Sequence, residues 1–302
     1  MPDDVSVRVH VVPFQSRGAW RRVADVCSAV IQPADVVHVT GDIHFVALGL
    51  RKSRTVLTVL DCGGVHRSGW KGRVFRSVWI RWPARRAARV VAISESTADE
   101  LARVAGLQRD AIDVIPVPID ESCTPQPPPR NAVPVLLCFG HSPNKNVERI
   151  IEAVRGLEVE FRVVGLLAPS TAALLAGSGL RFTNGVGLSD PQLLEWYAAA
   201  DVVVFPSLYE GFGMPIVEAQ AVGRPVVTSD RSPMRDVAGE AACLVDPENV
   251  ESIRAGIEKV LTDRGYAESL VVAGFANRER FRARQAAEQY AEVYREVARK
   301  RR

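Results

Sequence analysis

The chain has 302 residues, of which 47% are hydrophobic and 24% are charged, and its formal net charge is +3. This composition excludes a disordered, collagen-like or disulfide-rich protein, and at about 150 residues per domain the length suits two hydrophobic cores. A charge so close to balance indicates no particular class of partner.

Short runs of β-branched residues alternate with longer segments of helical period along the whole chain. This alternation is typical of βαβ units in a parallel sheet, so we expect an α/β fold. In the first half the pattern predicts helices at Ala19–Ile31 and Thr97–Ala105 and strands at Val36–Val39, Thr55–Leu60, Val90–Ile93 and Ile112–Val117. Ser96 and Thr97 each precede an acidic residue by three positions, which is the spacing of a helix capping box.

A proline-rich stretch between Pro116 and Pro134 suits neither a helix nor a central strand, and we place the domain linker there. Beyond it the pattern predicts strands at Pro134–Phe139, Phe161–Val164, Val202–Phe205 and Pro225–Thr228, a helix over 147–154 and a last helix at Arg282–Arg299. The predicted parts are an N-terminal domain (1–121), a linker (122–133), a C-terminal domain (134–277) and a C-terminal helix (278–302).

The loop after Pro134–Phe139 has features of a phosphate site. Open parallel sheets bind ligands at the carboxyl ends of their strands, and here the strand leads into Gly140-His141-Ser142-Pro143-Asn144-Lys145-Asn146, a tight loop that opens onto a helix. Free helix N–H groups and the charge of Lys145 suit a diphosphate. The alternative interpretation is an ordinary turn with a solvated lysine.

The stretch Pro206–Ala219, after the strand at Val202–Phe205, is the most informative in the chain. Its two glycines let the backbone approach a ligand, and Pro215 fits the first turn of a helix. Glu210 lies in the loop, where it can accept hydrogen bonds from sugar hydroxyls, and Glu218 lies just over one helical turn further on, where it can bind both hydroxyls of a ribose. For either glutamate taken singly, the alternative is a solvated surface charge.

These loops resemble those of a known enzyme family. Residues 205–223 are similar to the Glu-x7-Glu motif of retaining glycosyltransferases of family 4, and Gly140–Asn146 resembles their phosphate loop. Leu193–Asp201 and Pro225–Val245 resemble the flanking segments, so that the likeness covers roughly 139–247. It implies the GT-B fold, in which two Rossmann-like domains face each other across a cleft, with a C-terminal helix that returns to the N-terminal domain.

The resemblance also implies roles for the residues. Glu218 would hold the donor ribose, Lys145 would neutralise the diphosphate, and Glu210 would contact the transferred sugar. The other donor-binding residues implied are Gly140, His141, Asn144, Phe212, Gly213 and Met214. The donor would be a UDP- or GDP-linked hexose, whose phosphate deprotonates the acceptor on the face from which it departs. The chain has no Asp-x-Asp motif, so we expect retaining transfer with no metal or other cofactor and with the leaving charge stabilised by Lys145 and the helix N-terminus.

The sequence departs from the family pattern at several positions. His141 and Asn144 stand where many members have basic residues, and Leu60 replaces a histidine that lies beside the donor sugar. The chain also passes quickly from Val7–Val12 to Ser16–Trp20. We therefore expect a shortened acceptor domain.

Several polar residues at predicted strand ends in the first half are candidates for the acceptor side. Asp61, with Gly63 and Gly64, follows one strand, and Asp42 and His44 follow another. We interpret Asp61 and His44 as catalytic-side residues next to an acceptor hydroxyl. The alternative is that these are turn and capping groups.

A basic and aromatic run extends from Arg67 to Arg89. It holds eight basic residues, no acidic residue, and Trp70, Phe75, Trp79 and Trp82. Such a stretch can lie on an anionic bilayer, so we hypothesise peripheral membrane contact and a lipid-linked acceptor, with a small molecule as the alternative acceptor. The alternative is a solvated helix whose aromatics pack in the core. No recognised motif accompanies the run, so we expect no nucleic acid partner.

The cysteines and the start of the chain bear on location. Five scattered cysteines without C-x-x-C spacing argue against disulfides and against a zinc site. Met1–Asp4 shows no leader pattern, and no window approaches about 18 uninterrupted apolar residues. We expect a cytoplasmic protein, held peripherally at the inner face of the membrane if the basic run binds lipid.

Two other functions remain as alternatives to a transferase. Leu60, His141 and Asn144 are compatible with a catalytically degenerate homologue that binds nucleotide sugar and assists a partner transferase. A dinucleotide-dependent oxidoreductase is less well supported, because no Gly-x-Gly-x-x-Gly follows a predicted strand.

Overall fold

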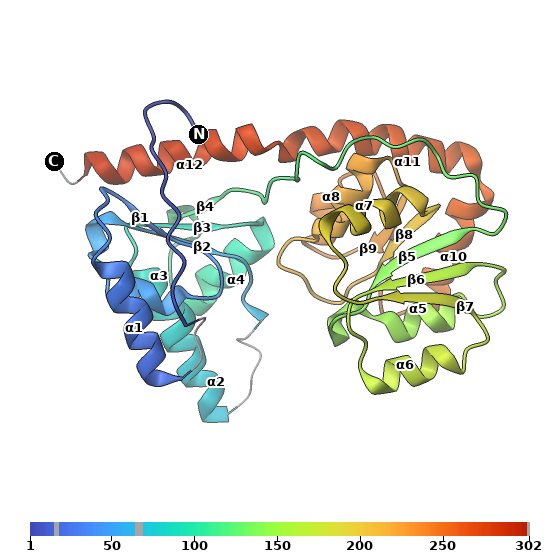
Figure 1. The fold of residues 1–302 in the computed structure, drawn as a ribbon, viewed down its shortest axis with the longest axis horizontal. Coiled ribbons are helices and arrows are strands. Elements are labelled where there is room, and N and C mark those ends of the chain that lie inside the picture. Colours follow the sequence, from blue (N-terminus) through green and yellow to red (C-terminus); the bar gives the residue numbers. More distant parts are fainter. Residues whose placement is uncertain (15–17, 64–68, 301–302) are drawn as a thin grey trace. The chain divides into compact units, whose positions relative to one another are not determined.

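The computed structural model describes the chain except residues 15–17, 64–68 and 301–302, and it divides into two compact units (Figure 1). Unit 1 comprises Met1–Val117 together with Ala283–Arg302, and unit 2 comprises Pro118–Arg282. Each unit has its own parallel sheet and its own core. The two-core architecture expected from the length is therefore confirmed.

The sheet of unit 1 has four parallel strands in the order β1-β2-β3-β4. The strands are β1 (Val37–Val39), β2 (Thr55–Val59), β3 (Arg89–Ala92) and β4 (Ile112–Val114). One face is covered by α1 (Ala19–Val30), the 3-10 turn η1 (His44–Leu48), α3 (Trp82–Arg86) and α4 (Glu95–Ala105). Side chains alternate between the two faces of a strand, so Leu57 and Val59 enter this core while Val56 points to the opposite face.

The opposite face of the unit 1 sheet is covered by the C-terminal helix α12 (Ala283–Arg299). Val293 and Val297 pack against Val56 and Val91 there. The sequence therefore predicted correctly that the last helix returns to the N-terminal domain. The apolar stripe of α12 is buried against this face of the sheet.

A polar cluster also fastens α12 to the sheet. His38 Nδ1 lies 2.8 Å from Tyr294 Oη, and His38 Nε2 lies 2.7 Å from Thr58 Oγ1. Tyr290 Oη lies 3.1 Å from the same threonine hydroxyl. Burial lowers the pKa of His38 to about 4, so the imidazole is neutral at pH 7.

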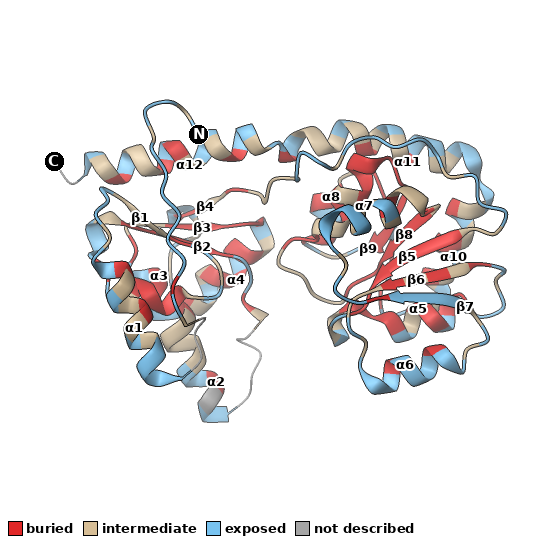
Figure 2. Ribbon diagram, viewed as in Figure 1, coloured by how far each residue is buried: buried red, intermediate tan, exposed pale blue. Residues whose placement is uncertain are grey.

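The sheet of unit 2 has six parallel strands in the order β10-β9-β8-β5-β6-β7. The strands are β5 (Val135–Phe139), β6 (Glu160–Val164), β7 (Arg181–Gly185), β8 (Val202–Phe205), β9 (Val226–Ser229) and β10 (Cys243–Val245). Figure 2 shows β5, β8 and β9 in the buried class and the edge strand β7 largely exposed. The central strands read as continuous apolar runs because helices cover both of their faces.

The helices of unit 2 alternate with its strands along the chain and cover both faces of the sheet. They are α5 (Val147–Ala153), α6 (Pro169–Ala176), α7 (Asp190–Ala199), α8 (Met214–Val222), α9 (Met234–Ala238), α10 (Val250–Thr262) and α11 (Arg264–Asn277). Helices α5 and α10 bury Ile151 and Ile257 against the face of the sheet that presents Leu136 and Val204. On the other face α7 and α8 pack over the neighbouring positions, where Tyr197 contacts Phe139.

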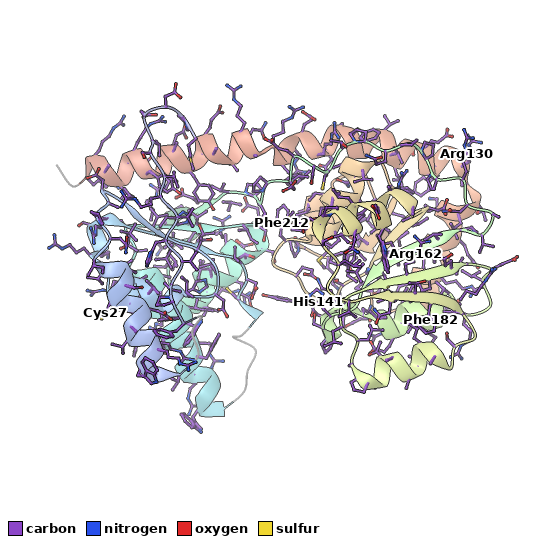
Figure 3. All side chains as sticks on the ribbon, in the orientation of Figure 1. Cys27, Arg130, His141, Arg162, Phe182 and Phe212 are labelled. Carbon is purple, nitrogen blue, oxygen red and sulfur yellow. The ribbon has the colours of Figure 1, made fainter. Side chains whose placement is uncertain are left out.

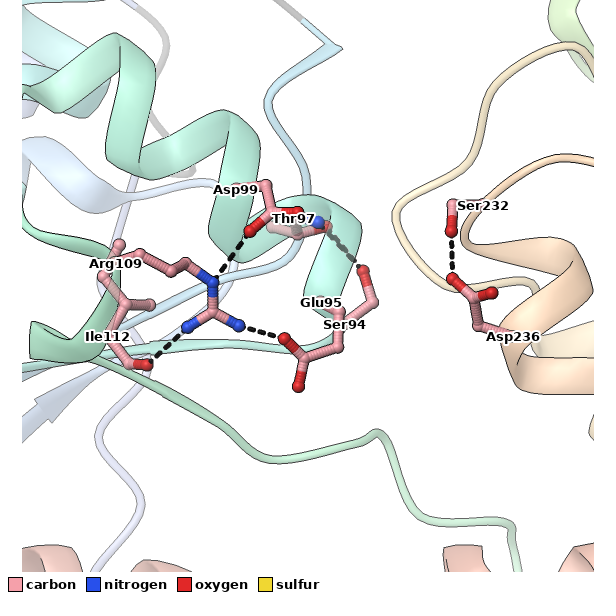
Figure 4. Close-up of polar contacts among 8 residues, drawn as sticks. All are labelled: Ser94, Glu95, Thr97, Asp99, Arg109, Ile112, Ser232 and Asp236. Carbon is pink, nitrogen blue, oxygen red and sulfur yellow. Dashed lines mark hydrogen bonds and ion pairs between the residues drawn. The ribbon is translucent and has the colours of Figure 1, made fainter.

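The predicted elements agree with the structure to within three residues at each end, with two kinds of exception. Strands β7 and β10 were not predicted, because β7 is a polar edge strand and β10 has only three residues. The capping prediction was wrong, since α4 begins at Glu95 and is capped by Ser94, whose side chain accepts from the backbone N–H of Thr97. A neighbouring exposed network joins Arg109 to Glu95 and Asp99 (Figure 4).

The segment predicted as the linker, 122–133, belongs to the compact body of unit 2. Gln126 N donates to the carbonyl of Val222, and the guanidinium of Arg224 donates to the carbonyl of Pro127. The chain changes from one unit to the other between Val117 and Pro118 and again between Arg282 and Ala283.

Candidate active site

The two loops singled out in the sequence follow neighbouring strands of unit 2. Strands β5 and β8 pair in parallel, with Leu137 opposite Val203, so their carboxyl ends lie at the same edge of the sheet. Figure 3 labels His141 and Phe212 on these two loops. This edge is where an open α/β sheet binds its ligands.

A buried ion pair joins the two loops. Lys145 Nζ lies 2.7 Å from Glu210 Oε1, and the two side chains are only 7% and 13% exposed. The ammonium also lies 4.7 Å from the centre of the Phe205 ring. Asn144 adds a second link, because its side-chain amide donates to the carbonyl of Tyr209 at 2.7 Å and to Glu210 Oε1 at 3.3 Å. The loops are thus fixed to each other through charged and amide groups.

Asn146 explains why the first loop turns where it does. It is buried and adopts a left-handed conformation with φ of 63°. Its amide donates to the carbonyls of Pro206 and Pro247 at 3.0 and 2.7 Å, which ties the loop to the segments after β8 and β10. Gly140 is also required, since a Cβ there would lie 2.5 Å from Leu167 Cδ2. These contacts hold Lys145 in place before any ligand arrives.

His141 lies near the ion pair and is exposed. Partial burial lowers its pKa, the nearby charge of Lys145 lowers it further, and Glu210 acts in the opposite direction. The imidazole is therefore neutral at pH 7, with one nitrogen able to donate and the other able to accept. It does not supply the positive charge that many family members place at this position.

Residues 212–214 form the entry to α8. Gly213 has φ of 106°, a conformation that favours glycine, and Pro215 occupies the first turn of the helix. The N-cap residue, Gly213, has no side chain that could cap this helix N-terminus. Phe212 is buried against Phe281 at a ring-centre distance of 5.5 Å, so its side chain packs in the core of unit 2 and only its backbone is available to a ligand.

Glu218 lies on α8 and has a partner that the sequence did not reveal. The hydroxyl of Tyr197, on α7, donates to Glu218 Oε2 at 2.6 Å. Burial raises the pKa of Glu218, the hydrogen bond from Tyr197 lowers it, and the charges of Asp120 and Asp190 raise it. Tyr197 is fully buried. Its hydroxyl bonds to Oε2 of Glu218 and not to Oε1. The only signal in the sequence was that Tyr197 belongs to the helix resembling the segment before the Glu-x7-Glu motif.

The structure thus brings Lys145, Glu210, Asn144 and His141 together, although they come from two loops 65 residues apart. The sequence predicts that Lys145 binds the diphosphate and that Glu210 binds the transferred sugar. In the structure the two side chains also bind each other. Each retains hydrogen-bonding capacity beyond this contact, because an ammonium has three N–H groups and a carboxylate has about four acceptor sites.

The acceptor-side candidates of the first half also meet. Asp42, His44 and Asp61 line a cavity of about 270 Å³ at the carboxyl ends of β1 and β2, together with Leu60 and Trp79. The nearby Gly64 lies outside the described residues. His44 Nδ1 is bonded to the backbone carbonyl of Trp79 at 3.0 Å, and among the described residues its Nε2 has no hydrogen-bond partner. Asp61 makes a contact of the kind expected from a turn residue, because its Oδ1 accepts from the backbone N–H of Gly63 at 2.8 Å.

The basic and aromatic run is helical, and two of its aromatic residues are exposed while two others stack on each other. It forms α2 (Gly69–Phe75), a π-helical segment (Arg76–Arg81) and α3. Trp70 and Trp82 are 65% and 55% exposed, whereas Phe75 and Trp79 stack on each other at 5.4 Å. Arg67 and the side chain of Lys71 lie outside the described residues. No helix in the described ranges is long and apolar enough to cross a membrane.

Comparison with known proteins identifies the family of the chain. Residues 133–263 match the family model described as glycosyl transferases group 1, and residues 1–118 match the glycosyl transferase 4-like domain. The chain belongs to this glycosyltransferase family. The expected family is thereby confirmed, and the chain matches a model of each of its two domains.

Curated relatives of this glycosyltransferase include two mannosyltransferases. The MMP α-(1→4)-mannosyltransferase of Mycolicibacterium hassiacum is 31% identical over 192 residues, which cover 59% of this chain and 46% of the relative. The O-antigen chain mannosyltransferase B of Escherichia coli is 41% identical over 92 residues, which cover 30% of this chain and 24% of the relative. The chain matches less than half of the length of either protein.

Solved structures confirm the predicted GT-B fold of this glycosyltransferase. Sucrose-phosphate synthase of Thermosynechococcus elongatus superposes with a TM-score of 0.78 at 20% identity, covering 92% of this chain and 78% of that one. HepE of Anabaena, in complex with UDP and glucose, superposes with a TM-score of 0.76 at 18% identity, covering 94% and 83%. At these identities the likeness concerns the fold alone.

Proposed function

We propose that this chain is a retaining glycosyltransferase that moves a hexose-type sugar from UDP- or GDP-sugar to a hydroxyl of an acceptor. The observation that carries the proposal is the buried Lys145–Glu210 pair at the carboxyl ends of β5 and β8, in a member of this family. The UDP and glucose bound to HepE, which has the same fold, support a nucleotide-sugar donor.

The ion pair prepares the donor site for charge that develops during the reaction. Lys145 is held by Glu210 and by the fixed loop, so it loses little further freedom when its remaining N–H groups bind a diphosphate. The uncapped N-terminus of α8, with Gly213 allowing close approach, adds backbone N–H groups. As the sugar leaves, the extra negative charge on the nucleotide is stabilised by groups already in position.

The transfer step requires no protein nucleophile in this proposal. The acceptor oxygen forms a bond to the anomeric carbon on the face from which the phosphate departs. The bond between that carbon and the phosphate oxygen breaks, and the acceptor proton passes to the departing phosphate oxygen. Glu210 orients the sugar hydroxyls, and no metal is assigned a role. Among the described residues, no three His, Cys, Asp or Glu side chains gather in a way that could hold a metal ion.

Glu218 binds the ribose of the donor in this proposal. Tyr197 occupies Oε2, which leaves Oε1 for the ribose hydroxyls. The backbone of residues 212–214 and the groups of Gly140, His141 and Asn144 line the rest of the donor site. Asp61 and His44 lie on the acceptor side, in unit 1.

A screen of nucleotide sugars tests the proposal directly. Thermal shift with UDP, GDP, TDP and ADP sugars identifies a donor, because a ligand at 100 times its Kd stabilises the folded state by about 2.7 kcal/mol. The donor found should be hydrolysed slowly and transferred when an acceptor is added, and Glu210→Gln should lower the turnover. Binding without hydrolysis or transfer would instead identify a catalytically degenerate homologue that assists another transferase.

We also propose peripheral contact with the inner face of the membrane, which would suit a lipid-linked acceptor. The exposed Trp70 and Trp82, among the arginines of the same run, support it. Liposome flotation should show binding that depends on anionic lipid and falls when both tryptophans are replaced by serine. Equal and negligible flotation with neutral and anionic vesicles would refute membrane contact and leave a small-molecule acceptor in a cytoplasmic enzyme.

A further inference from the structure

The strand β7 leaves one edge of the unit 2 sheet open. It is the last strand in the order β10-β9-β8-β5-β6-β7, and four of its five residues are exposed (Figure 2). The other edge strands of the two sheets, β10, β1 and β4, have three residues each. A short edge strand, a proline or a lysine usually protects an edge from pairing with another chain, and β7 has none of these. This edge is therefore a candidate interaction surface.

The pairing of β7 with β6 determines which backbone groups face outward. The carbonyl of Gly185 accepts from the N–H of Gly165, which directly follows β6. In a strand the N–H and C=O of one residue point to the same side, and this side alternates from residue to residue. The backbone groups of Phe182 and Asn184 consequently point away from β6, and no described residue bonds to them. Both residues thus offer a donor and an acceptor to another strand.

The helix α6 extends this edge with an uncharged surface. Phe182 pairs with Phe161 of β6, which packs in the same core as Leu175 of α6, so Phe182 lies on the face of the sheet that α6 covers (Figure 3). Phe182 and Leu174 are 42% and 37% exposed. Helix α6 has no charged residue, and its other exposed side chains are those of proline, serine and alanine. Such small side chains allow a second helix to approach closely.

The backbone pattern of β7 is complementary to itself about a two-fold axis at Thr183. Antiparallel pairing about this axis places Phe182 opposite Asn184 of the second copy, and Asn184 opposite Phe182 of that copy. Each of these pairs exchanges both of its N–H···O bonds, which uses all the outward groups of the two residues. Thr183 then lies opposite Thr183 of the second copy in a pair without hydrogen bonds. An antiparallel strand at the edge of a parallel sheet is common.

The charges at this edge also fit a second copy of the chain. Arg181 is the one charged residue of β7, and in this register it lies opposite the uncharged Gly185 of the second copy, so no like charges face each other. A Cβ at Gly185 would lie 2.7 Å from Trp196 Cη2, which shows that the indole occupies the space beside this glycine. The guanidinium of Arg181 can therefore make a cation–π contact with Trp196 of the second copy. Arg162, which lies 5.9 Å from the centre of the same ring, is paired with Glu160.

We propose that the chain forms a symmetric dimer in which β7 pairs antiparallel with β7 of a second copy about a two-fold axis at Thr183. The unit 2 sheets of the two copies then form one continuous sheet. Because an axis perpendicular to a sheet leaves its faces unchanged, the α6 helices of both copies lie on the same face, beside the axis. This dimer goes beyond the proposed transferase function and does not depend on it.

Analytical ultracentrifugation of the whole chain over a dilution series tests the dimer, and charges at position 183 test its symmetry. Thr183→Lys and Thr183→Glu each place like charges opposite each other across the axis, so each variant alone should associate at least tenfold more weakly than the wild type. An equimolar mixture of the two variants should recover the dimer, because opposite charges then meet. Thr262→Glu, at an exposed threonine of unit 2 away from β7, is the matched control and should dimerise like the wild type.

Three results of this experiment would overturn the proposal. They are a wild-type chain that stays monomeric across the series, position 183 variants that associate as strongly as the wild type, and a mixture that associates no more strongly than the single variants. Thr183 is exposed, so the melting temperature followed by circular dichroism should be unchanged in both variants.

Cysteine cross-linking tests the register without introducing charge. Thr183→Cys, combined with Cys27→Ser to remove the exposed native thiol, should form a disulfide between two copies on mild oxidation. The Cα atoms of a directly opposed pair without hydrogen bonds are about 4.5 Å apart, which a disulfide can bridge. Arg181→Cys in the same background is the matched control and should stay unlinked on a non-reducing gel, because it lies opposite Gly185 and not opposite itself. Equal cross-linking of the two variants, or none of Thr183→Cys, overturns the proposal.

Discussion

Both units place carboxylates at the carboxyl ends of parallel strands, Glu210 after β8 in unit 2 and Asp61 after β2 in unit 1. In unit 2 the carboxylate is buried and paired with Lys145 at 2.7 Å. In unit 1 the carboxylates are exposed at a cavity that His44 also lines, and burial lowers the pKa of this histidine. The same fold position thus has two electrostatic environments, a buried carboxylate neutralised by a lysine in unit 2 and exposed carboxylates in unit 1.

The largest expected effect comes from breaking the buried pair of unit 2. Lys145→Met leaves Glu210 buried without its cation, so we expect a loss of about 3–5 kcal/mol in the free energy of unfolding. The double variant Lys145→Met with Glu210→Met should recover most of this stability and still lack transferase activity, since both groups bind the donor in the proposed function. Denaturant unfolding followed by circular dichroism measures the first effect and a turnover assay the second. A double variant as unstable as the single one would contradict this account of the pair.

His38, on β1 of unit 1, should make the stability of the chain depend on pH. His38 has a pKa of about 4 in the folded chain against the ordinary histidine value of 6.5 in the unfolded chain, so between these values the unfolded chain binds a proton that the folded chain does not. Stability should therefore fall as the pH drops from about 6.5 to about 4, by up to about 3 kcal/mol. His38→Gln should flatten this dependence in urea unfolding followed by tryptophan fluorescence. The exposed His10→Gln is the control and should retain the slope of the wild type.

Tyr197 provides a test of how unit 2 prepares its second carboxylate. Tyr197→Phe removes the hydrogen bond to Glu218, and a hydrogen bond to a charged group contributes about 1.5–3 kcal/mol. The pKa of Glu218 should rise further in this variant. Burial and the charges of Asp120 and Asp190 already raise this pKa, and the bond from Tyr197 is the contribution that lowers it. In the proposed function the ionised carboxylate of Glu218 binds the ribose, so the nucleotide affinity of the variant should fall at a higher pH than that of the wild type. Titration calorimetry with UDP and GDP between pH 5 and 8 measures this shift, and parallel pH profiles would show that Tyr197 has only a packing role.

The smallest effect is expected at an exposed network of unit 1. Arg109 binds Asp99 at 2.8 Å and also contacts Glu95, but these side chains are 36–67% exposed (Figure 4). Arg109→Ala should cost only about 0.2–1 kcal/mol, and less at high salt, because solvent screens such pairs. The difference in unfolding free energy lost by Arg109→Ala and by Lys145→Met, measured in the same assay, shows how strongly burial changes the contribution of an ion pair. Equal losses in the two variants would mean that burial is not what distinguishes them.

Local patterns in the sequence determined most of the elements and marked one edge of the unit 2 sheet as a candidate site. Apolar runs with turn residues between them predicted all but two short or polar strands, and glycines with Lys145, Glu210 and Glu218 marked the loops. Such patterns reflect side chains a few residues apart, which follow the period of a helix or strand.

The tertiary structure alone decided which of these groups meet. Lys145 reaches Glu210 because β5 and β8 are neighbours in the strand order, although 65 residues separate the two side chains. The hydroxyl of Tyr197 reaches Glu218 because α7 and α8 cover the same face, and His44 Nδ1 is bonded to a carbonyl 35 residues away because the π-helical segment packs against the loop after β1. Hydrogen bonding and burial depend on positions in space across such separations, and no local periodicity encodes them.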